Sequence, residues 1–315
     1  MVMDVQKYLF LPTVDGDYCR IPALITADDG SIIAAADKRY SHSGDLGSHK
    51  IDVILRRSTD GGKTWGEVQT IAAGDGSTEA AYGYGDPSFV KGKNGKLFCL
   101  FAAGSKGFGN GLNHIGMTTS TDNGQTWSTV VDITTRSGKW TNNSGYEDFF
   151  VTSGKGLYTS DGVLMFLLDV DRSAEKNYVL YSTDEGESWI IDGTVVATGA
   201  NEAKLVELEP GRLLSSTRAY YARIFNNGTY TKNQDGTCTF SWETQRTESA
   251  LTQSGSGNNQ DVIVYDRDEN GVAQMLLHTT YFGPIQWYQS LYRSDDVVID
   301  GDERWQKQTI RNRCQ

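Results

Sequence analysis

One eight-residue pattern occurs three times, at residues 58–65 (STDGGKTW), 120–127 (STDNGQTW) and 182–189 (STDEGESW). The copies share the form S-T-D-x-G-x-S/T-W, and successive copies begin 62 residues apart. Such self-similarity at a fixed period indicates a repeated structural unit. Two fainter copies extend the series, a degenerate SDD at residues 294–296 and NQDG at residues 233–236, which precedes Trp242.

The chemistry of the pattern is that of a tight turn between two strands. Alternating apolar runs precede the copies, as in residues 51–55 (IDVIL) and 178–181 (YVLY), and further strand-like runs follow them. Ser and Asp oxygens accept hydrogen bonds from turn amides, Gly allows the positive φ of a turn, and Trp packs against a neighbouring repeat. A 62-residue antiparallel unit is typical of a four-stranded propeller blade. Because helical periodicity is weak throughout, the sequence predicts an all-β fold.

Composition and charge narrow the classes of protein and partner. The chain of 315 residues has 35 Gly, 5 Pro and many aromatic residues, which suits strands joined by tight turns and excludes disorder. Its net charge of −11 argues against nucleic acid as the main partner. No apolar stretch is long enough for membrane insertion. The four Cys and four His residues are scattered, so we expect no metal and no cofactor.

The repeated turns resemble the Asp-boxes, or BNR repeats, of the sialidase-like propellers. This resemblance implies a six-bladed sialidase-type β-propeller of four-stranded antiparallel blades, forming a single domain over residues 1–315. Six blades at the observed period would need roughly 370 residues, so we expect either an incomplete, abbreviated last blade or a C-terminus truncated before the nucleophile. Asp-boxes are specific for the architecture and not for an activity, so function has to be argued from other residues.

Residues 20–22, Arg-Ile-Pro, resemble a motif of the exo-sialidases (neuraminidases). In that family the Arg is the first of three that grip the substrate carboxylate, for which a planar guanidinium is well matched. The alternative is an Arg in a surface ion pair. Arg39 follows 19 residues after Arg20, at a place that fits a further substrate-binding Arg of the family.

An acidic residue of the next loop fits the acid/base catalyst of the same family. Asp45 lies among Gly and Ser residues, where it could protonate a leaving oxygen and then activate water, although Asp is also common in turns. Asp52 is the competing candidate for this role, but it stands at the start of a strand and more readily has a structural role. Asp86, before Pro87, resembles a residue that contacts a sugar hydroxyl, and the alternative is a simple turn before proline.

A later pair of strands resembles the part of the family that carries the base. Glu202 would be the base beside a nucleophilic Tyr, and Arg218 the second carboxylate clamp, with a rim ion pair as the alternative for Arg218. Glu207 is the competing carboxylate, but it falls on the opposite strand face from Glu202.

The resemblance breaks near the C-terminus. Gln286 stands where the family has its third Arg, and the nearest Arg is Arg293. The nucleophilic Tyr would be expected beyond Gln315.

The resemblance as a whole implies an exo-α-sialidase that hydrolyses terminal sialic acid from glycans with retention, through a Tyr–Glu nucleophile pair. Its partners would be sialylated glycans, and we expect a monomer. The alternatives are a propeller that binds sialoglycans without cleaving them and a purely structural propeller. The N-terminus, MVMDVQKYLFLP, has no signal-peptide pattern, and we expect a secreted, periplasmic or cell-surface protein of a bacterium.

Overall fold

The computed structural model describes residues 9, 13–14, 17–47, 49–136, 148–170, 174–199, 201–248, 259–267 and 273–278. Within these residues nearly all regular structure is β-strand, and the helical pieces are three short ones, η1 (Glu79–Ala81), η2 (Lys93–Gly95) and α1 (Ile133–Arg136). The all-β prediction is therefore confirmed. No helix in the described part of the chain is long and apolar enough to cross a membrane.

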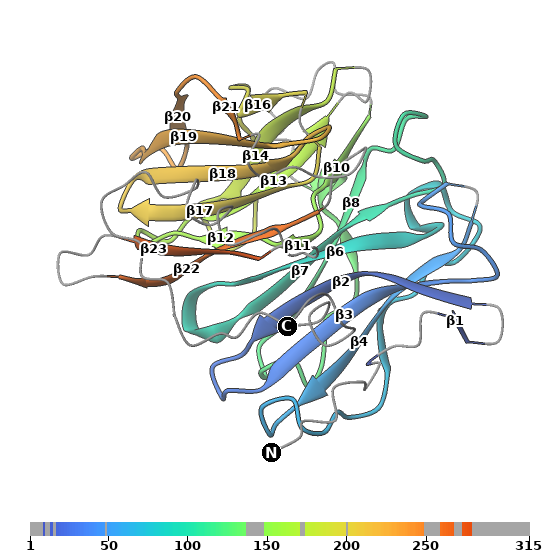
Figure 1. The fold of residues 1–315 in the computed structure, drawn as a ribbon. Coiled ribbons are helices and arrows are strands. Elements are labelled where there is room, and N and C mark those ends of the chain that lie inside the picture. Colours follow the sequence, from blue (N-terminus) through green and yellow to red (C-terminus); the bar gives the residue numbers. More distant parts are fainter. Residues whose placement is uncertain are drawn as a thin grey trace, which may run out of the picture.

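The strands form sheets that follow one another in chain order (Figure 1). Blade 1 contains β2 (Asp17–Thr26), β3 (Ile32–Arg39), β4 (Ile51–Ser58) and β5 (Gln69–Ala72), with β1 (Thr13–Val14) beside β2. Blade 2 contains β6 (Tyr84–Lys91), β7 (Leu97–Ala103), β8 (His114–Ser120) and β9 (Val131–Asp132). The short β11 (Gly154–Lys155) runs parallel to β6, which ties the next blade to blade 2.

Blade 3 is built on the long strands β13 (Leu164–Val170) and β14 (Lys176–Ser182). Four short strands complete it: β10 (Phe149–Val151), β12 (Leu157–Tyr158), β15 (Ile190–Ile191) and β16 (Ala197–Thr198). Blade 4 contains β17 (Ala203–Glu209), β18 (Arg212–Arg218), β19 (Arg223–Lys232) and β20 (Cys238–Trp242), with β21 (Arg246–Glu248) beside β19. A fifth sheet holds β22 (Asp261–Arg267) and β23 (Ala273–His278).

Four antiparallel blades of the expected four-stranded kind are thus present, and this part of the prediction is confirmed. The rest of the predicted fifth blade, the predicted sixth blade and the closure of the ring would fall on residues outside the described part of the chain, so the six-bladed ring stays a prediction. The core lies between the blades, because each of the three largest apolar clusters combines residues from two consecutive blades. Both faces of a blade are therefore buried, which explains continuous apolar runs such as LFCLFAA in β7 and LMFLLDV in β13.

Each Asp-box forms the turn between the third and fourth strands of its blade, as predicted, and the three turns repeat the same hydrogen bonds. The Ser hydroxyl donates to the Asp carboxylate at 2.8 Å in Ser58–Asp60, Ser120–Asp122 and Ser182–Asp184. The same hydroxyl oxygen accepts from the Gly amide at 2.9 Å in all three turns. The turns are held together by their own side chains, which is why the pattern repeats so closely in the sequence.

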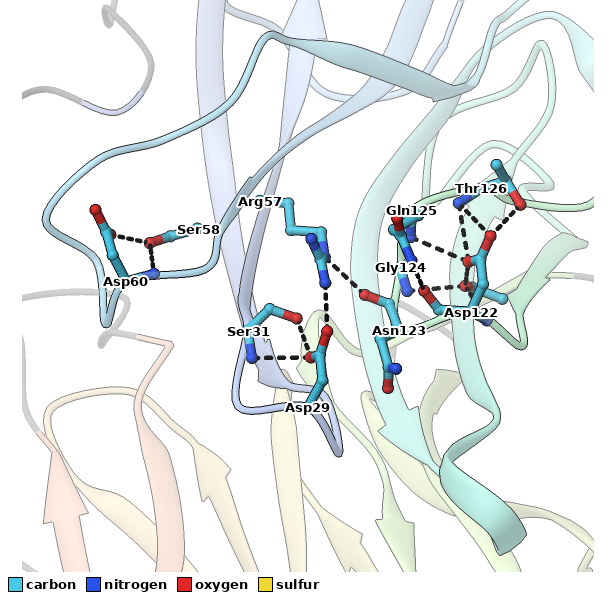
Figure 2. Close-up of polar contacts among 11 residues, drawn as sticks. Asp29, Ser31, Arg57, Ser58, Asp60, Asp122, Asn123, Gly124, Gln125 and Thr126 are labelled. Atoms are coloured by element: carbon cyan, nitrogen blue, oxygen red, sulfur yellow. Dashed lines mark hydrogen bonds and ion pairs between the residues drawn. The ribbon is translucent and has the colours of Figure 1, made fainter.

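The Asp-boxes of blades 2 and 3 also rest on the blade before them. A Cβ on Gly124 would lie 2.3 Å from the side chain of Ile33 in blade 1, and one on Gly186 would lie 2.6 Å from Phe98 in blade 2. Both glycines have positive φ, so they are required for turn conformation and close approach alike. Figure 2 shows Arg57 of blade 1 donating to the Asn123 carbonyl of blade 2 at 2.9 Å.

The fainter trace at residues 233–236 is a turn of the same kind between β19 and β20. Asp235 accepts from the Thr237 amide at 2.9 Å, and Gly236 has a φ of +83°. The Gly236 carbonyl accepts from the Thr183 hydroxyl of blade 3 at 2.7 Å. This turn therefore docks on the preceding blade as the Asp-boxes do, whereas the copy at residues 294–296 lies outside the described residues.

Candidate active site

The predicted site residues lie at the opposite end of the blades from the Asp-boxes. Strands alternate in direction, so the β3–β4 loop and the β18–β19 turn share one end, and the turns after β4, β8 and β14 share the other. Asp45 belongs to the first of these loops, and Arg218 ends β18 at the second. The end with the Asp-boxes repeats from blade to blade, whereas the other end carries residues that occur once.

The structure brings Arg20, Arg39 and Asp45 into one cluster. Arg39 Nη1 donates to Asp45 Oδ1 at 2.7 Å, and Arg20 Nη1 lies 3.7 Å from the same oxygen. Both arginines also donate to the Ser43 carbonyl, which fixes the course of the loop. The side chain of Asp45 is 76 % exposed and that of Arg20 is 47 % exposed, so both are available to a ligand.

Arg39 itself is buried, with a side chain only 1 % exposed. Its guanidinium donates twice to Asp37 Oδ2, at 2.8 and 3.2 Å, besides its contacts with Asp45 and Ser43. A substrate contact for Arg39 stays a prediction. What the geometry adds is that Arg39 holds Asp45 in place from beneath.

Asp37 was not singled out by the sequence reasoning. Its side chain is fully buried, and burial raises its pKa to about 6 against the lowering effect of Arg39. Asp37 Oδ1 accepts from the backbone amide of Asp86 at 2.9 Å, which joins blade 1 to blade 2. The available signal was the Asp-x-Arg spacing of Asp37 and Arg39, directly after the apolar run of residues 32–36 in β3.

Asp86 lies between the two halves of the site. It is half-buried at a bulge of β6 and has a φ of +59°, a conformation rarely adopted by residues other than glycine. Burial and the nearby charges of Asp37, Glu202 and Asp45 raise its pKa well above the usual range, with Arg39 opposing. The carboxyl of Asp86 is therefore close enough to sense both predicted catalytic residues.

Glu202 and Arg218 form the second cluster. They are cross-strand neighbours at the start of β17 and the end of β18, and Arg218 Nη1 donates to Glu202 Oε2 at 2.7 Å. Glu202 is 7 % exposed as a residue, and the side chain of Arg218 is 26 % exposed. The pair thus consists of a buried carboxylate and a guanidinium that is partly open to solvent.

Three further residues contact this cluster, and the sequence reasoning missed all of them. Glu202 Oε1 accepts from Asn259 Nδ2 at 2.9 Å and from the Ser153 hydroxyl at 3.3 Å. Lys204 Nζ donates to Asn259 Oδ1 at 2.7 Å. Ser153 and Asn259 lie 49 and 57 residues from Glu202 in the chain, so no local motif could have revealed them. Lys204 lies two residues after Glu202, but its contact runs through the distant Asn259.

The two rival carboxylates make structural contacts instead. Asp52 Oδ1 accepts from the Gly74 amide at 2.9 Å and Oδ2 accepts from the Tyr40 hydroxyl at 2.5 Å. Glu207, near the other end of β17, accepts from the Ser160 amide at 2.7 Å.

Several remaining predictions fall outside the described residues. Gln286 and Arg293, the expected place of the third Arg, lie there, as does any Tyr nucleophile near the C-terminus. Among the described residues no group of three or more metal-binding side chains gathers. Cys19, Cys99 and Cys238 are free thiols.

The sequence profile of the BNR repeat-like domain family matches residues 21–280. The chain belongs to this family, that of the sialidases with Asp-box repeats, as the repeated turns led us to expect.

Among its relatives are two bacterial proteins named sialidase. The chain is 33% identical over 218 residues to that of Bacteroides fragilis, covering 63% of this chain and 39% of the relative. It is 31% identical over 262 residues to that of Clostridium perfringens, covering 76% of this chain and 65% of the relative. The chain thus spans between about a third and two thirds of the length of the curated relatives it matches.

The fold is also found among solved structures. The Hadza microbial sialidase Hz136 superposes with a TM-score of 0.68 at 25% sequence identity, over 82% of this chain and 52% of that one.

Proposed function

We propose that the chain forms the catalytic domain of an exo-α-sialidase, which hydrolyses terminal sialic acid from glycans with retention. The observation that carries the proposal is that two carboxylates with different exposure and different cationic partners lie at the same end of the blades. Asp45 is exposed and held by two arginines, whereas Glu202 is buried and paired with Arg218. The relatives named above are sialidases, which supports the proposal.

The residues of the two clusters divide the chemical tasks among them. Arg20 and Arg218 bind the carboxylate of the sialic acid through their planar guanidinium groups. Asp45, in contact with solvent on its glycine-rich loop, protonates the leaving oxygen and then activates water. Arg39 and Asp37 hold Asp45 in place from below.

Glu202 serves as the base for a tyrosine nucleophile that comes from outside the described residues. The phenol gives its proton to Glu202 as its oxygen attacks the anomeric carbon, and the bond to the leaving oxygen breaks. That carbon bears a carboxylate in sialic acid, so a neutral phenol approaches it with less repulsion than an anionic nucleophile. No step in this scheme needs a metal or an organic cofactor.

Hydrolysis of a sialoside by the full-length protein is the direct test. We expect fluorophore release from an aryl sialoside, and its loss in Arg20→Ala. Asp45→Asn should lose roughly 10²–10³-fold in kcat on sialyllactose and much less on the aryl sialoside, whose leaving group needs little protonation. Arg212→Ala is a matched control, since Arg212 lies at the other end of β18 and pairs with exposed Glu209.

The alternative, a propeller that binds sialoglycans without cleaving them, predicts a different result. Sialyllactose would then bind saturably without turnover, and Arg20→Ala would abolish the binding. Absence of release by the full-length wild-type protein would refute the enzymatic proposal.

A further inference from the structure

A buried lysine lies directly behind Glu202. Lys204 is 2 % exposed, and a Cβ on Gly154 would lie only 2.8 Å from its Cε. Gly154 therefore leaves the space that the lysine side chain fills. A buried ammonium is costly unless it is paired, and an apolar residue would occupy the same position at lower cost. Its presence beside the predicted base calls for a chemical reason.

Asn259 connects this ammonium to Glu202 in one orientation only. An ammonium offers donors alone and a carboxylate offers acceptors alone, so Oδ1 of the amide must face Lys204 and Nδ2 must face Glu202. The distances, 2.7 Å to Lys204 Nζ and 2.9 Å to Glu202 Oε1, agree with this assignment. Nδ2 also donates to the Ser153 hydroxyl at 2.7 Å, and that hydroxyl donates to Glu202 Oε1.

The two oxygens of Glu202 are unequal as a result. Oε1 accepts from both Asn259 and Ser153, which fills its two lone-pair directions. Oε2 accepts from Arg218 and, within the described part of the chain, from no other donor, so one of its directions is open. Oε2 is therefore the oxygen that can receive a further proton.

We propose that Lys204 and Asn259 are positioning residues that hold a positive charge behind Glu202 and direct its Oε2 toward the nucleophile. The identity of the nucleophile as a phenol rests on the proposed function, whereas the effect on Glu202 does not. In the reaction the phenol O–H bond breaks, its proton passes to Oε2, and the phenol oxygen bonds to the anomeric carbon as the leaving oxygen departs.

The groups around Lys204 set the pH range in which its side chain is a charged ammonium beside Glu202. Burial lowers the pKa of Lys204 to about 8, while Glu202 and Asp261 act to raise it and Arg223 and Lys155 to lower it. The ammonium is present below pH 8 and is lost as the pH rises through that value. Support for Glu202 therefore weakens in alkaline solution.

Kinetics of Lys204→Met and Asn259→Ala test the proposal in the full-length protein. We expect kcat on an aryl sialoside to fall roughly 10–100-fold while KM changes by less than about threefold. The acid limb of the pH profile should move to higher pH by about one unit in Lys204→Met, because loss of the ammonium favours the protonated form of Glu202. A merely structural role would leave the pH profile in place.

Lys155→Met is the matched control. Lys155 is the neighbouring half-buried lysine, and it pairs with Asp261 at 3.4 Å rather than with the Asn259 amide. We expect near wild-type kcat and an unmoved pH profile. An equal effect of Lys155→Met and Lys204→Met would overturn the proposal, since it would then reflect charge in the core and not a contact with Glu202.

A second readout does not depend on turnover. The side-chain carboxyl of Glu202 can be titrated by carbon-13 NMR in glutamate-labelled protein, with its signal assigned by its absence in Glu202→Gln. The midpoint should move to higher pH in Lys204→Met and not in Lys155→Met. An unmoved midpoint would refute the positioning role. A wild-type protein without turnover would refute the proposed function alone, and the titration would still decide on Lys204.

Discussion

One buried glutamate lies just before β17 and another near its far end, and the two are surrounded differently. Glu202 and Glu207 are both 7 % exposed. Glu207 accepts from neutral groups, the Ser160 amide at 2.7 Å and the Tyr230 hydroxyl at 3.0 Å, at the end where the Asp-boxes repeat. Glu202 faces the cation of Arg218 and, through Asn259, that of Lys204. Burial alone therefore does not distinguish the two residues, and the comparison depends on the two cations beside Glu202.

The largest expected effect is on catalysis at Glu202. Glu202→Gln keeps the size of the side chain but removes the base, so we expect kcat to fall at least ~10³-fold, equivalent to about 4 kcal/mol. The measurement is the rate on an aryl sialoside, with the melting temperature followed in parallel.

Glu207→Gln is the counterpart that would break the comparison. It should leave kcat within about twofold and lower stability by about 1–2 kcal/mol, because one oxygen that accepts hydrogen bonds becomes a donor. A loss of kcat comparable to that of Glu202→Gln would show that the two ends of β17 are not functionally distinct.

The second effect is a pH dependence of the stability of the fold, caused by Asp37 at the end of the blades that carries the site. Burial raises the pKa of Asp37 to about 6, above its unfolded value, so the folded state binds this proton more tightly. The resulting stability is fully present below about pH 4 and is lost as the pH rises through 6, up to ~3 kcal/mol in all. Urea unfolding from pH 4 to 7 should show this slope in the wild type and not in Asp37→Asn. Equal slopes in the two proteins would contradict it.

The third effect concerns the Asp-box end. Burial opposes the ionisation of Asp122, but hydrogen bonds from Thr126 outweigh it and lower the pKa of Asp122 to about 2. Asp122→Ala removes these bonds, drawn in Figure 2, and should cost about 2 kcal/mol of stability without changing kcat. Thermal unfolding measures the loss. A drop in kcat at temperatures where the variant is folded would argue against a purely structural turn.

The smallest effect lies in the β18–β19 turn, next to Arg218. Tyr221 is 67 % exposed and has a φ of +58°, which is strained for a bulky residue. Tyr221→Gly should raise stability by about 0.5 kcal/mol, the relief of strain less the greater freedom of glycine in the unfolded chain. Tyr220, its equally exposed neighbour, is not in this conformation, and Tyr220→Gly should be slightly destabilising.

The sequence revealed what depends on near neighbours in the chain. The Asp-box turns could be predicted because Ser, Asp and Gly bond to one another within a few residues. The position of Asp45 on an exposed loop followed from the Gly and Ser around it. The partners of Glu202 could not be predicted, because Ser153 and Asn259 reach it only when three blades pack, and Lys204 is connected to it only through Asn259. Asp37 shows the same limit, since its partner amide belongs to the next blade.

The docking of the repeated turns of blades 2, 3 and 4 on the blade before them has a consequence for biosynthesis. Gly124 rests on Ile33, Gly186 on Phe98, and the Gly236 carbonyl on Thr183, so the support always precedes the turn in the chain. On the ribosome, the N-terminal part emerges and folds first. Every such turn therefore meets a surface that has already been translated, and each blade can template the next in the order of synthesis.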